Sequence, residues 1–378
     1  MTGEKGNNRV VVDLAALREN YRNLTAFIKD SARILAVVKS DAYGHGLVRV
    51  AQCLQEEGVE VFGVAEVDEG VALRQAGITG EIIVLLGVMP DEYHDVVQHR
   101  LSPVVFDRGT LITLSDYAGE HDWVVPIHLK IDTGMGRLGI MPHELDMYLS
   151  FIQAMTGIHL VGLLSHFPMA DAPEREATDL QNRHFASLAA KNRLLFPGVR
   201  LHAANSAGLI NHPASHYDLV RPGITLYGCS PCPEKQGDGQ PLLQPVMAFH
   251  SRVVQVKEVP AGYGISYGHL FKTERVTRLA VLPVGYDDGY LRKLTGRAHV
   301  LIHGQRVSIV GRICMNACMA DVTDLAWVEV GDDVVLMGRQ GDGIITAEEI
   351  AGWMDTIHYE VLCLFGSMNR RTYLDGSA

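Results

Sequence analysis

The sequence predicts an α/β protein built as a (β/α)8 TIM barrel followed by a C-terminal, mainly antiparallel β domain. In the first part of the chain, short apolar runs alternate with stretches that carry apolar residues at helical spacing. This order produces a parallel sheet covered by helices. After residue 245 the helical spacing almost disappears, and apolar runs are separated instead by glycine turns. We therefore assign residues 1–240 to the barrel domain and residues 241–378 to the β domain.

Eight apolar runs in the barrel domain are short enough to be strands and lack the length of a helix. They are Ile34 to Val38, Val61 to Val64, Ile82 to Leu85, Pro103 to Phe106, Ile127 to Ile131, Leu160 to Leu164, Arg200 to Ala203 and Leu219 to Arg221. Helical stretches such as Leu47 to Glu57 and Asp179 to Leu195 separate them. Eight such βα units match the number in a closed barrel.

The boundary between the domains is predicted from composition. Residues 234–245, EKQGDGQPLLQP, are polar and rich in glycine and proline, which is typical of a linker. Beyond them, SRVVQVKEV, RLAVLPVG, AHVLIHGQRVSIVG and DDVVLMG alternate or run apolar between glycines. Such segments indicate antiparallel strands.

Composition narrows the functional classes. The chain has 378 residues, a formal charge of −11 and 47% apolar residues, so it has no electrostatic reason to bind nucleic acid. No apolar run approaches the ~20 residues that span a bilayer, and the start of the sequence lacks a secretory signal. We expect a cytoplasmic protein without a membrane partner. Its six cysteines are expected to remain thiols, and the single pair Cys229 and Cys232 does not predict a metal site.

The first predicted strand ends at a lysine, in AVVKSDAYGHG. A lysine does not belong inside a strand that is buried on both faces, so Lys39 is expected at the carboxyl edge of the barrel, followed by Tyr43 in a glycine-containing loop. One interpretation is a lysine whose ammonium group reaches water. The other is a desolvated amine that is available for Schiff-base chemistry. The local pattern by itself does not decide between them.

Other polar residues follow the later strands, at the barrel edge where this fold carries its chemistry. They are Lys130 and Arg137 after the fifth strand, Ser165 and His166 after the sixth, Asn205 and Ser206 after the seventh, and Arg221, Gly223 and Ile224 after the eighth. Taken alone, His166 is better explained by a structural hydrogen bond, and Arg137 by a surface ion pair. Together, a reactive lysine, donors for a phosphate near the last two strands and an aromatic residue at the rim indicate a pyridoxal phosphate (PLP) site.

Eight motifs carry a resemblance to the bacterial alanine racemase family. They are AVVKSDAYGHG, HLKIDTGMGRLG, LLSHF, NSAG, RPGITLYG, GISYG, LPVGYDDGY and GRICMNACM, and they occur in this order along the chain. The resemblance as a whole runs from near residue 9 to Arg371. The resemblance implies a PLP-dependent isomerase that interconverts L- and D-alanine and supplies D-alanine for peptidoglycan. It makes Lys39 the lysine that carries the cofactor. No metal is implied.

Racemisation removes a proton from one face of the substrate and returns a proton to the other, which requires two acid/base groups. The resemblance implies that Lys39 serves one face and Tyr267 the other, across the interface of a homodimer with shared active sites. A tyrosine, with a usual pKa near ~10, is a poor base unless a nearby cation favours its phenolate, and we expect His166 with Arg221 behind it to supply that environment.

The same resemblance assigns the remaining site residues. Arg221 would face the pyridine nitrogen, and Arg137 would contact the cofactor and the substrate carboxylate with help from the backbone of Met315. Lys130 matches a lysine that is carbamylated in many relatives. The phosphate contacts would come from Tyr43, Asn205, Ser206, Gly223, Ile224 and Tyr359, and the entrance would be lined by Tyr286, Asp171 and Arg312.

Two positions depart from the family pattern. Asn316 stands where the family usually has aspartate, which removes a negative charge near the expected entrance, and Asp287 stands where alanine is common.

Three alternatives remain open at this point. A broader amino-acid racemase that accepts serine or larger substrates fits the same residues. A PLP-dependent amino-acid decarboxylase of the same architecture would need a carboxylate at the pyridine nitrogen, and Arg221 argues against it. A non-catalytic PLP carrier needs neither the β domain nor Tyr267.

Overall fold

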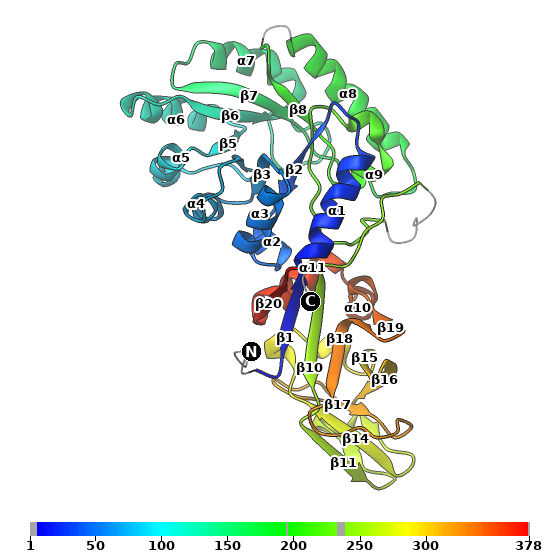
Figure 1. Cartoon of the computed structure of the whole chain (residues 1–378). Helices are drawn as coiled ribbons and strands as arrows, with labels where there is room; N and C mark the ends of the chain where they lie inside the picture. Colours follow the sequence, from blue (N-terminus) through cyan, green and yellow to red (C-terminus); the bar gives the residue numbers. More distant parts are fainter. Residues whose placement is uncertain (1–5, 194–195, 233–238, 377–378) are drawn as a thin grey trace. The chain divides into compact units, whose positions relative to one another are not determined.

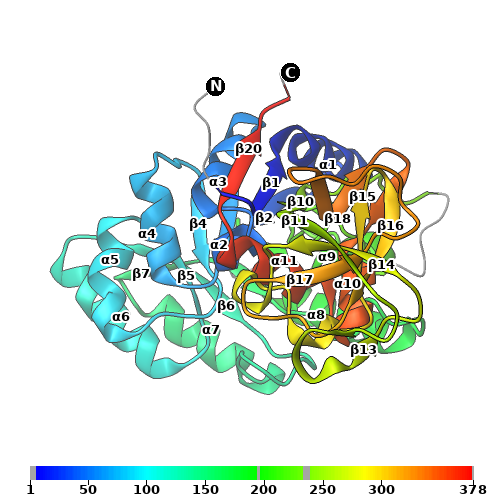
Figure 2. The same ribbon diagram turned by 90° about the horizontal axis from the view of Figure 1, so that it is seen from below.

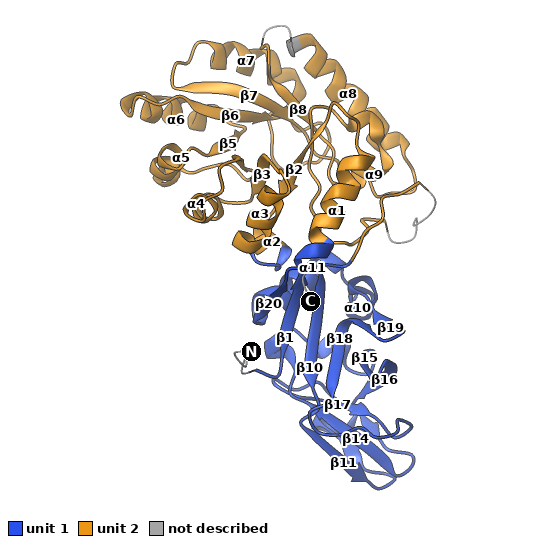
Figure 3. Ribbon diagram, viewed as in Figure 1, with its two compact units in different colours: residues 1–16, 43–46, 245–378 blue, residues 17–42, 47–244 orange. Residues whose placement is uncertain are grey.

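The computed structural model describes residues 6–193, 196–232 and 239–376, and the chain forms two compact units (Figures 1 and 3). The barrel unit contains residues 17–42 and 47–244, and the β unit contains residues 1–16, 43–46 and 245–378. The β unit resumes at residue 245, close to the predicted boundary after residue 240. Residues 6–16, which we assigned to the barrel domain, lie in the β unit because their strand, β1 (Arg9–Asp13), pairs there with two strands that follow residue 245.

All eight predicted barrel strands are present and all their ladders are parallel, in the order β8-β7-β6-β5-β4-β3-β2-β9. They are β2 (Arg33–Val37), β3 (Val61–Val64), β4 (Glu81–Val84), β5 (Ser102–Val105), β6 (Val125–Lys130), β7 (Ile158–Leu164), β8 (Arg200–His202) and β9 (Leu219–Val220). Backbone hydrogen bonds from Asp218 N to Leu201 O (3.0 Å) and from Arg221 N to Ala204 O (2.9 Å) connect the last strand to β8. The predicted barrel is present, and these bonds bring β8 and β9, the two ends of the sheet, together so that it is nearly closed.

Helices follow the barrel strands. They are α3 (Leu47–Glu56), α4 (Val67–Gln75), α5 (Tyr93–Gln98), α6 (Arg108–Glu120), α7 (Leu145–Gln153), α8 (Glu176–Arg193) and α9 (Ser206–Asn211). In contrast, α1 (Leu14–Phe27) precedes the first barrel strand, β2. Figures 1 and 2 show α4, α5 and α6 on the outer side of β4, β5 and β6. The predicted helices beginning at Leu47 and Asp179 correspond to α3 and α8, while Leu195 and residues 234–238 of the predicted linker lie outside the described residues.

Two fully buried histidines, His128 on β6 and His202 on β8, lie among the apolar residues of the barrel. The ladder between β6 and β7 shifts its register at His128, which pairs with Gly162. A Cβ atom at Gly162 would lie 2.0 Å from His128 Nδ1. The bulge and the glycine therefore leave the space that the imidazole occupies.

The β unit is built around a mainly antiparallel sheet in the order β11-β14-β17-β16-β15-β18-β10-β1-β20, with β19 paired to β18 and a separate β12-β13 hairpin. Only β1 and β20 pair in parallel within this sheet. The strands are β1 (Arg9–Asp13), β10 (Met247–Arg252), β11 (Gln255–Val259), β12 (Gly264–Ile265), β13 (Phe271–Lys272), β14 (Thr277–Leu282), β15 (His299–Ile302), β16 (Gln305–Val310), β17 (Cys318–Asp321), β18 (Asp333–Gln340), β19 (Gly343–Ile345) and β20 (Arg371–Leu374).

The β unit also contains α10 (Ala347–Met354) and α11 (His358–Met368), which the strand patterns did not predict. The Thr346 hydroxyl caps α10 by accepting a hydrogen bond from Glu349 N (3.2 Å). A threonine followed three residues later by glutamate is a helix-start signal that the search for strands overlooked.

In the described part of the chain, no helix is both long enough and apolar enough to cross a membrane. All six cysteines are free thiols, as expected.

The space beside His128 generates a stability prediction. We expect Gly162→Ala to lower the free energy of unfolding by about 1–3 kcal/mol, because the added methyl group overpacks the barrel interior. Gly119→Ala is the matched control, since an added Cβ there meets no atom within 4 Å and Gly119 lies in α6. That control should be neutral or more stable by up to about 1 kcal/mol. Urea unfolding measures both, and equal stability of the two variants would contradict the packing argument.

Candidate active site

Lys39 begins α2 (Lys39–Tyr43), a turn of left-handed backbone rather than an ordinary loop. Ser40, Asp41, Ala42 and Tyr43 have φ values of 55°, 53°, 55° and 54°. Left-handed residues other than glycine cost roughly 1–2 kcal/mol each, so the surrounding structure must hold this conformation.

Hydrogen bonds from the flanking chain hold the turn. Asp41 Oδ1 accepts from Leu47 N (2.7 Å), and Asp41 N donates to Glu69 Oε1 (3.1 Å). The other oxygen of Glu69 accepts from Ala65 N (2.8 Å). Half-buried Lys39 is thereby held at the carboxyl end of β2, the edge predicted from the sequence.

The loop after β6 is organised around one carboxylate. Asp132 Oδ1 accepts from the backbone N–H groups of Gly134 (2.9 Å), Met135 (2.8 Å) and Gly136 (3.1 Å), and Oδ2 accepts from Arg137 N (3.0 Å). Burial opposes ionisation of Asp132, but these four donors lower its pKa below the usual value. The ionised carboxylate fixes the backbone of Arg137, whose side chain is exposed.

Four cations form what we call the cationic cluster: Lys39, Lys130, Arg137 and Arg221. Lys130 is only 5% exposed, and burial, Arg221 and Arg137 lower its pKa to about 8, with Lys39 acting in the same direction. Asp132 is the only carboxylate among these influences, and its oxygens already accept from its own loop. The cluster therefore has an excess of positive charge at the carboxyl edge of the barrel.

Arg221 is the buried centre of this cluster. It donates to the carbonyl oxygens of Ser165 (2.6 Å), His202 (2.7 Å) and Ala203 (3.0 Å), and to the ring nitrogens His202 Nδ1 (3.1 Å) and His166 Nδ1 (3.3 Å). Burial and Arg137 lower its pKa to about 9, which leaves the guanidinium charged at neutral pH. The pKa of His166 lies well below the usual value because of burial and the charge of Arg221, so this histidine is neutral. Of the two residues that we expected to provide a positive charge, Arg221 therefore carries it.

The segments after β8 and β9 meet at Ser206. The Ser206 hydroxyl oxygen accepts from Gly223 N (2.9 Å) and from Thr225 Oγ1 (3.1 Å), and Ile224 lies fully buried in the same turn. Asn205 caps α9 by accepting from Gly208 N (2.9 Å) and donates to Phe167 O (3.1 Å). The predicted phosphate residues of the barrel unit are therefore assembled in one place.

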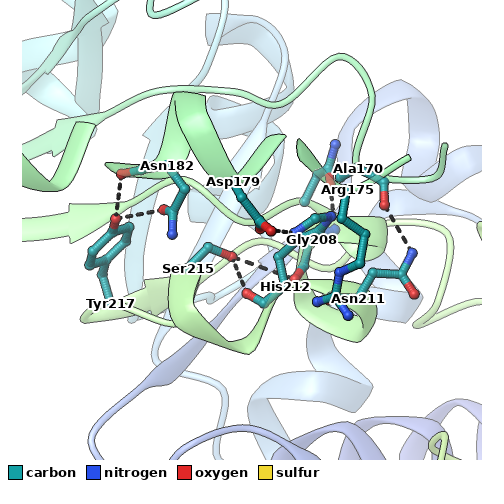
Figure 4. Close-up of polar contacts among 10 residues, drawn as sticks. Ala170, Arg175, Asp179, Asn182, Gly208, Asn211, His212, Ser215 and Tyr217 are labelled. Atoms are coloured by element: carbon teal, nitrogen blue, oxygen red, sulfur yellow. Dashed lines mark hydrogen bonds and ion pairs between the residues drawn. The ribbon is translucent and has the colours of Figure 1, made fainter. Parts of the chain in front are cut away.

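Figure 4 shows how the other end of α9 is anchored. His212 Nδ1 lies 2.8 Å from Asp179 Oδ1 on α8, and Asn211 Nδ2 donates to Ala170 O (2.9 Å). Tyr217 donates to Asn182 Oδ1 on α8 (2.6 Å), and Arg175 donates to Asn211 O. These contacts fix the short helix that begins at Ser206.

In the β unit, Tyr43 and Tyr359 lie together, with ring centroids 6.2 Å apart. Burial and Cys363 raise the pKa of Tyr43 above its usual value, so its hydroxyl stays protonated and can donate. Tyr359 lies on α11, which places a residue near the end of the sequence beside one that follows Lys39.

A second group in the β unit contains Tyr267, Tyr286, Arg312 and Met315. The Ser266 hydroxyl, next to Tyr267, donates to Arg312 O (2.6 Å), and Tyr286 N donates to Cys314 O (3.1 Å). A Cβ at Gly285 would lie 2.2 Å from Cys314 O, so only glycine permits this approach. Tyr267 is 71% exposed and lines an open groove with Lys257 and Tyr263.

The two positions that depart from the family pattern contact each other. Asn316 Nδ2 donates to Asp287 Oδ2 (3.2 Å), and Asp287 N donates to Met315 O (3.1 Å). Asp287 thus supplies a carboxylate beside Asn316, which offsets the loss of negative charge expected from Asn316 alone.

Asp171, the remaining predicted entrance residue, has an exposed side chain in the barrel unit, and its carbonyl oxygen accepts from Cys232 Sγ (3.7 Å). The predicted entrance residues are thus divided between the units, because Tyr286 and Arg312 lie in the β unit.

The structure also reveals polar residues that the motif search overlooked: Asp132, Glu69, Thr225, Glu81, His128 and His202. Period-two alternation on β6 places His128 on the same side as Lys130, which is a usable signal. No local sequence pattern could have indicated Glu81 or His202, because the residues that they contact lie far from them in the sequence.

Family models match both parts of the chain: "Alanine racemase, N-terminal domain" over residues 12–231 and "Alanine racemase, C-terminal domain" over residues 246–373. A protein named alanine racemase from Syntrophobacter fumaroxidans is 42% identical over 369 residues, covering 98% of each chain.

Solved structures of alanine racemases have the same fold. The enzyme from a D-cycloserine-producing Streptomyces lavendulae has a TM-score of 0.93 and 35% identity, covering 99% of each chain. The alanine racemase of Bartonella henselae, solved with covalently bound pyridoxal phosphate, has a TM-score of 0.87 and 28% identity, covering 98% of this chain and 100% of that one. With both family models matched and this identity over almost the full length, the chain belongs to the alanine racemase family, a family of isomerases that act on amino acids.

Proposed function

We propose that this protein is a PLP-dependent racemase that interconverts L- and D-alanine. The observation that carries the proposal is the cationic cluster: in addition to burial, three cations, Arg221, Arg137 and Lys39, act together to lower the pKa of Lys130, against the single carboxylate of Asp132. A doubly charged phosphate and a phenolic oxygen would neutralise this excess, so the donor set fits the cofactor. When bound, PLP withdraws electrons from the α-carbon of an amino acid and thereby acidifies its α-hydrogen.

The residues that would hold PLP follow from the assembled groups. Lys39 would bind the aldehyde carbon, and Arg221 would donate to the pyridine nitrogen. Arginine keeps its proton, so that nitrogen stays unprotonated, which favours simple proton exchange over transamination.

The phosphate would be bound by Ser206 and the backbone of Gly223 and Ile224, with Asn205 supporting them and Tyr43 and Tyr359 donating hydroxyl groups. Arg137 would hold the cofactor's phenolic oxygen and the substrate carboxylate.

The acid/base groups would be Lys39 for one face of the substrate and Tyr267 of a second subunit for the other. The 71% exposure of Tyr267 supports this arrangement, because its own β unit leaves the phenol uncovered. Met315, also exposed, would contribute its backbone to the same shared site. We therefore propose a homodimer.

Tyr286 and Tyr359 would narrow the entrance and favour a small substrate, and Asp171 and Arg312 are the other proposed entrance residues. The proposed cellular role is to supply D-alanine for peptidoglycan. We propose that the protein acts in the cytoplasm.

Lys130 is the proposed site of carbamylation. Its lowered pKa of about 8 increases the share of neutral amine, the form that reacts with carbon dioxide, and the carbamate would be stabilised by the neighbouring arginines. We expect a carbamate signal in carbon-13 NMR after addition of labelled bicarbonate. The signal should disappear in Lys130→Arg and persist in the exposed control Lys29→Arg. A protein without this signal would show that Lys130 is unmodified.

The shared site predicts complementation between two variants. Lys39→Ala should lose both racemisation and the near-visible absorbance of bound PLP, while Tyr267→Phe should lose most activity but keep the absorbance. Lys29→Ala and Tyr263→Phe are the controls, and both should retain activity. After subunit exchange between the two variants, half of the dimers are mixed and each has one intact site, so about one quarter of the normal activity should return.

Racemisation assays after mixing measure this recovery. No recovery, with subunit exchange verified by mass, would contradict the shared site. Retained PLP absorbance in Lys39→Ala would contradict the cofactor assignment.

The two-base arrangement predicts an asymmetry in proton exchange. Tyr267→Phe removes one phenolic oxygen, and loss of a positioned proton-transfer group costs about 10²–10⁴-fold in rate. Racemisation in both directions must fall, because the two enantiomers have equal free energies. In heavy water, however, the enantiomer whose α-hydrogen faces Lys39 should still exchange it without inversion. We expect this to be D-alanine, with L-alanine almost unlabelled.

Proton NMR of the recovered alanine measures the label in each enantiomer, with Tyr263→Phe as the control that labels both. Equal residual exchange from L- and D-alanine in Tyr267→Phe would mean that a single base, or solvent, serves both faces.

A further inference from the structure

A row of hydrogen-bonded side chains runs through the barrel unit from Arg221 to Glu81. Arg221 Nη1 lies 3.1 Å from His202 Nδ1, His202 Nε2 lies 3.0 Å from His128 Nδ1, and His128 Nε2 lies 3.2 Å from Glu81 Oε1. Arg200 completes the row by donating to both oxygens of Glu81 (2.6 and 2.8 Å).

Only one arrangement of hydrogens satisfies every contact in this row. Burial opposes ionisation of Glu81, but the hydrogen bonds and charges of His128 and Arg200 lower its pKa to about 2, so its carboxylate can only accept. His128 must therefore carry its hydrogen on Nε2. Burial lowers the pKa of His128 below the usual value, so the ring is neutral and Nδ1 is an acceptor.

The same reasoning continues to the guanidinium. His202 must donate from Nε2 to His128, and its pKa lies well below the usual value because of burial and the charge of Arg221. A neutral ring protonated on Nε2 has an accepting Nδ1, which is what Arg221 needs because a guanidinium has no acceptor. All hydrogens in the row therefore point from Arg221 toward Glu81.

Packing confines the two imidazoles to these contacts in the described part of the barrel unit. Both rings are fully buried and meet edge to face, at 84° with centroids 5.0 Å apart. Gly162 closes one side of His128, where even a methyl group would clash. Glu81 and Arg200 lie at the first residues of β4 and β8, whereas Arg221 follows the end of β9. The row thus connects the amino ends of the strands with the carboxyl edge that carries the site.

We propose that Glu81 is a positioning residue that acts through His128 and His202 to hold the guanidinium of Arg221. It does so by keeping the hydrogen of His202 on Nε2. If that hydrogen moved to Nδ1, two donors would face each other at the 3.1 Å that now separates His202 from Arg221, and the guanidinium would have to move. Only the consequence for PLP rests on the proposed function, whereas the hydrogen positions are a property of the chain itself.

The test replaces Glu81 by leucine, which removes the terminal acceptor. Arg200→Leu is the first control, because it breaks the same ion pair but leaves the carboxylate for His128. Glu57→Leu is the second control, because it also removes a carboxylate that accepts two hydrogen bonds from one arginine, from Arg22 Nε and Nη2 (each 2.8 Å). Glu57 is not a partner of either histidine of the row.

Nitrogen-15 NMR of the full chain with labelled histidine reads the hydrogen positions directly. We expect His128 and His202 to carry hydrogen on Nε2 in the unchanged protein and in both controls. In Glu81→Leu, we expect His202 to shift to the Nδ1 form or to a mixture. Unchanged Nε2 signals for both rings in Glu81→Leu would overturn the proposal.

Absorbance titration of the full chain with PLP measures the consequence for Arg221. Losing one hydrogen bond from a charged group should weaken PLP binding by about tenfold in Glu81→Leu and leave both controls within about twofold. An affinity in Glu81→Leu equal to that of the controls would show that Arg221 is positioned without Glu81. If the unchanged protein bound no PLP, the proposed function would fail while the NMR result still decided the hydrogen positions.

A second variant covers the possibility that Glu81→Leu does not fold. His128→Leu leaves the ion pair between Glu81 and Arg200 intact but deprives His202 Nε2 of its acceptor. The same shift of the His202 hydrogen and the same loss of PLP affinity are expected. A His202 that stays protonated on Nε2, with unchanged affinity, would overturn the proposal in this variant as well.

Discussion

The buried guanidinium of Arg221 is the constraint on which the site depends. A charge removed from water is costly unless hydrogen bonds and opposite charges compensate it. Three carbonyl oxygens and two imidazoles contact this guanidinium directly, and within the described residues no carboxylate is among its hydrogen-bond partners. The negative charge of Glu81 reaches it only through His202 and His128. These requirements explain why a mostly apolar barrel interior contains two neutral histidines, and why Gly162 faces one of them.

The second constraint is the accumulation of positive charge at the carboxyl edge of the barrel. Lys130 shows its effect most clearly, because burial and the neighbouring cations together lower its pKa to about 8. Such an arrangement is unfavourable by itself and becomes favourable when an anion binds. The left-handed turn after Lys39 adds strain at the same edge, held by Asp41 and Glu69. The protein thus maintains, at a cost in stability, a site that is complementary to a negatively charged ligand.

Much of the fold was predictable because its signals are local. The ends of the eight predicted strands lie within two residues of the ends of the observed strands. The prediction was this close because parallel strands that are buried on both faces consist of continuous apolar residues. The placement of Lys39, Arg137, His166 and Ser206 at one edge followed from the same pattern. The sequence did not indicate α10 and α11, and it did not show that β1 belongs with the β unit, because that strand pairs with β10 and β20 from the far end of the chain.

By itself, the sequence determined the fold class, the family and the residue types of the site, because apolar periodicity and collinear motifs are properties of neighbouring residues. The tertiary structure alone decided which charges interact. It paired Asn316 with Asp287, so that an apparent loss of negative charge is offset from a neighbouring loop. It also connected Glu81 through two histidines to Arg221, which lies 140 positions later in the chain. Protonation and hydrogen-bond direction depend on burial and on partners distant in sequence, and these exist only once the barrel has formed.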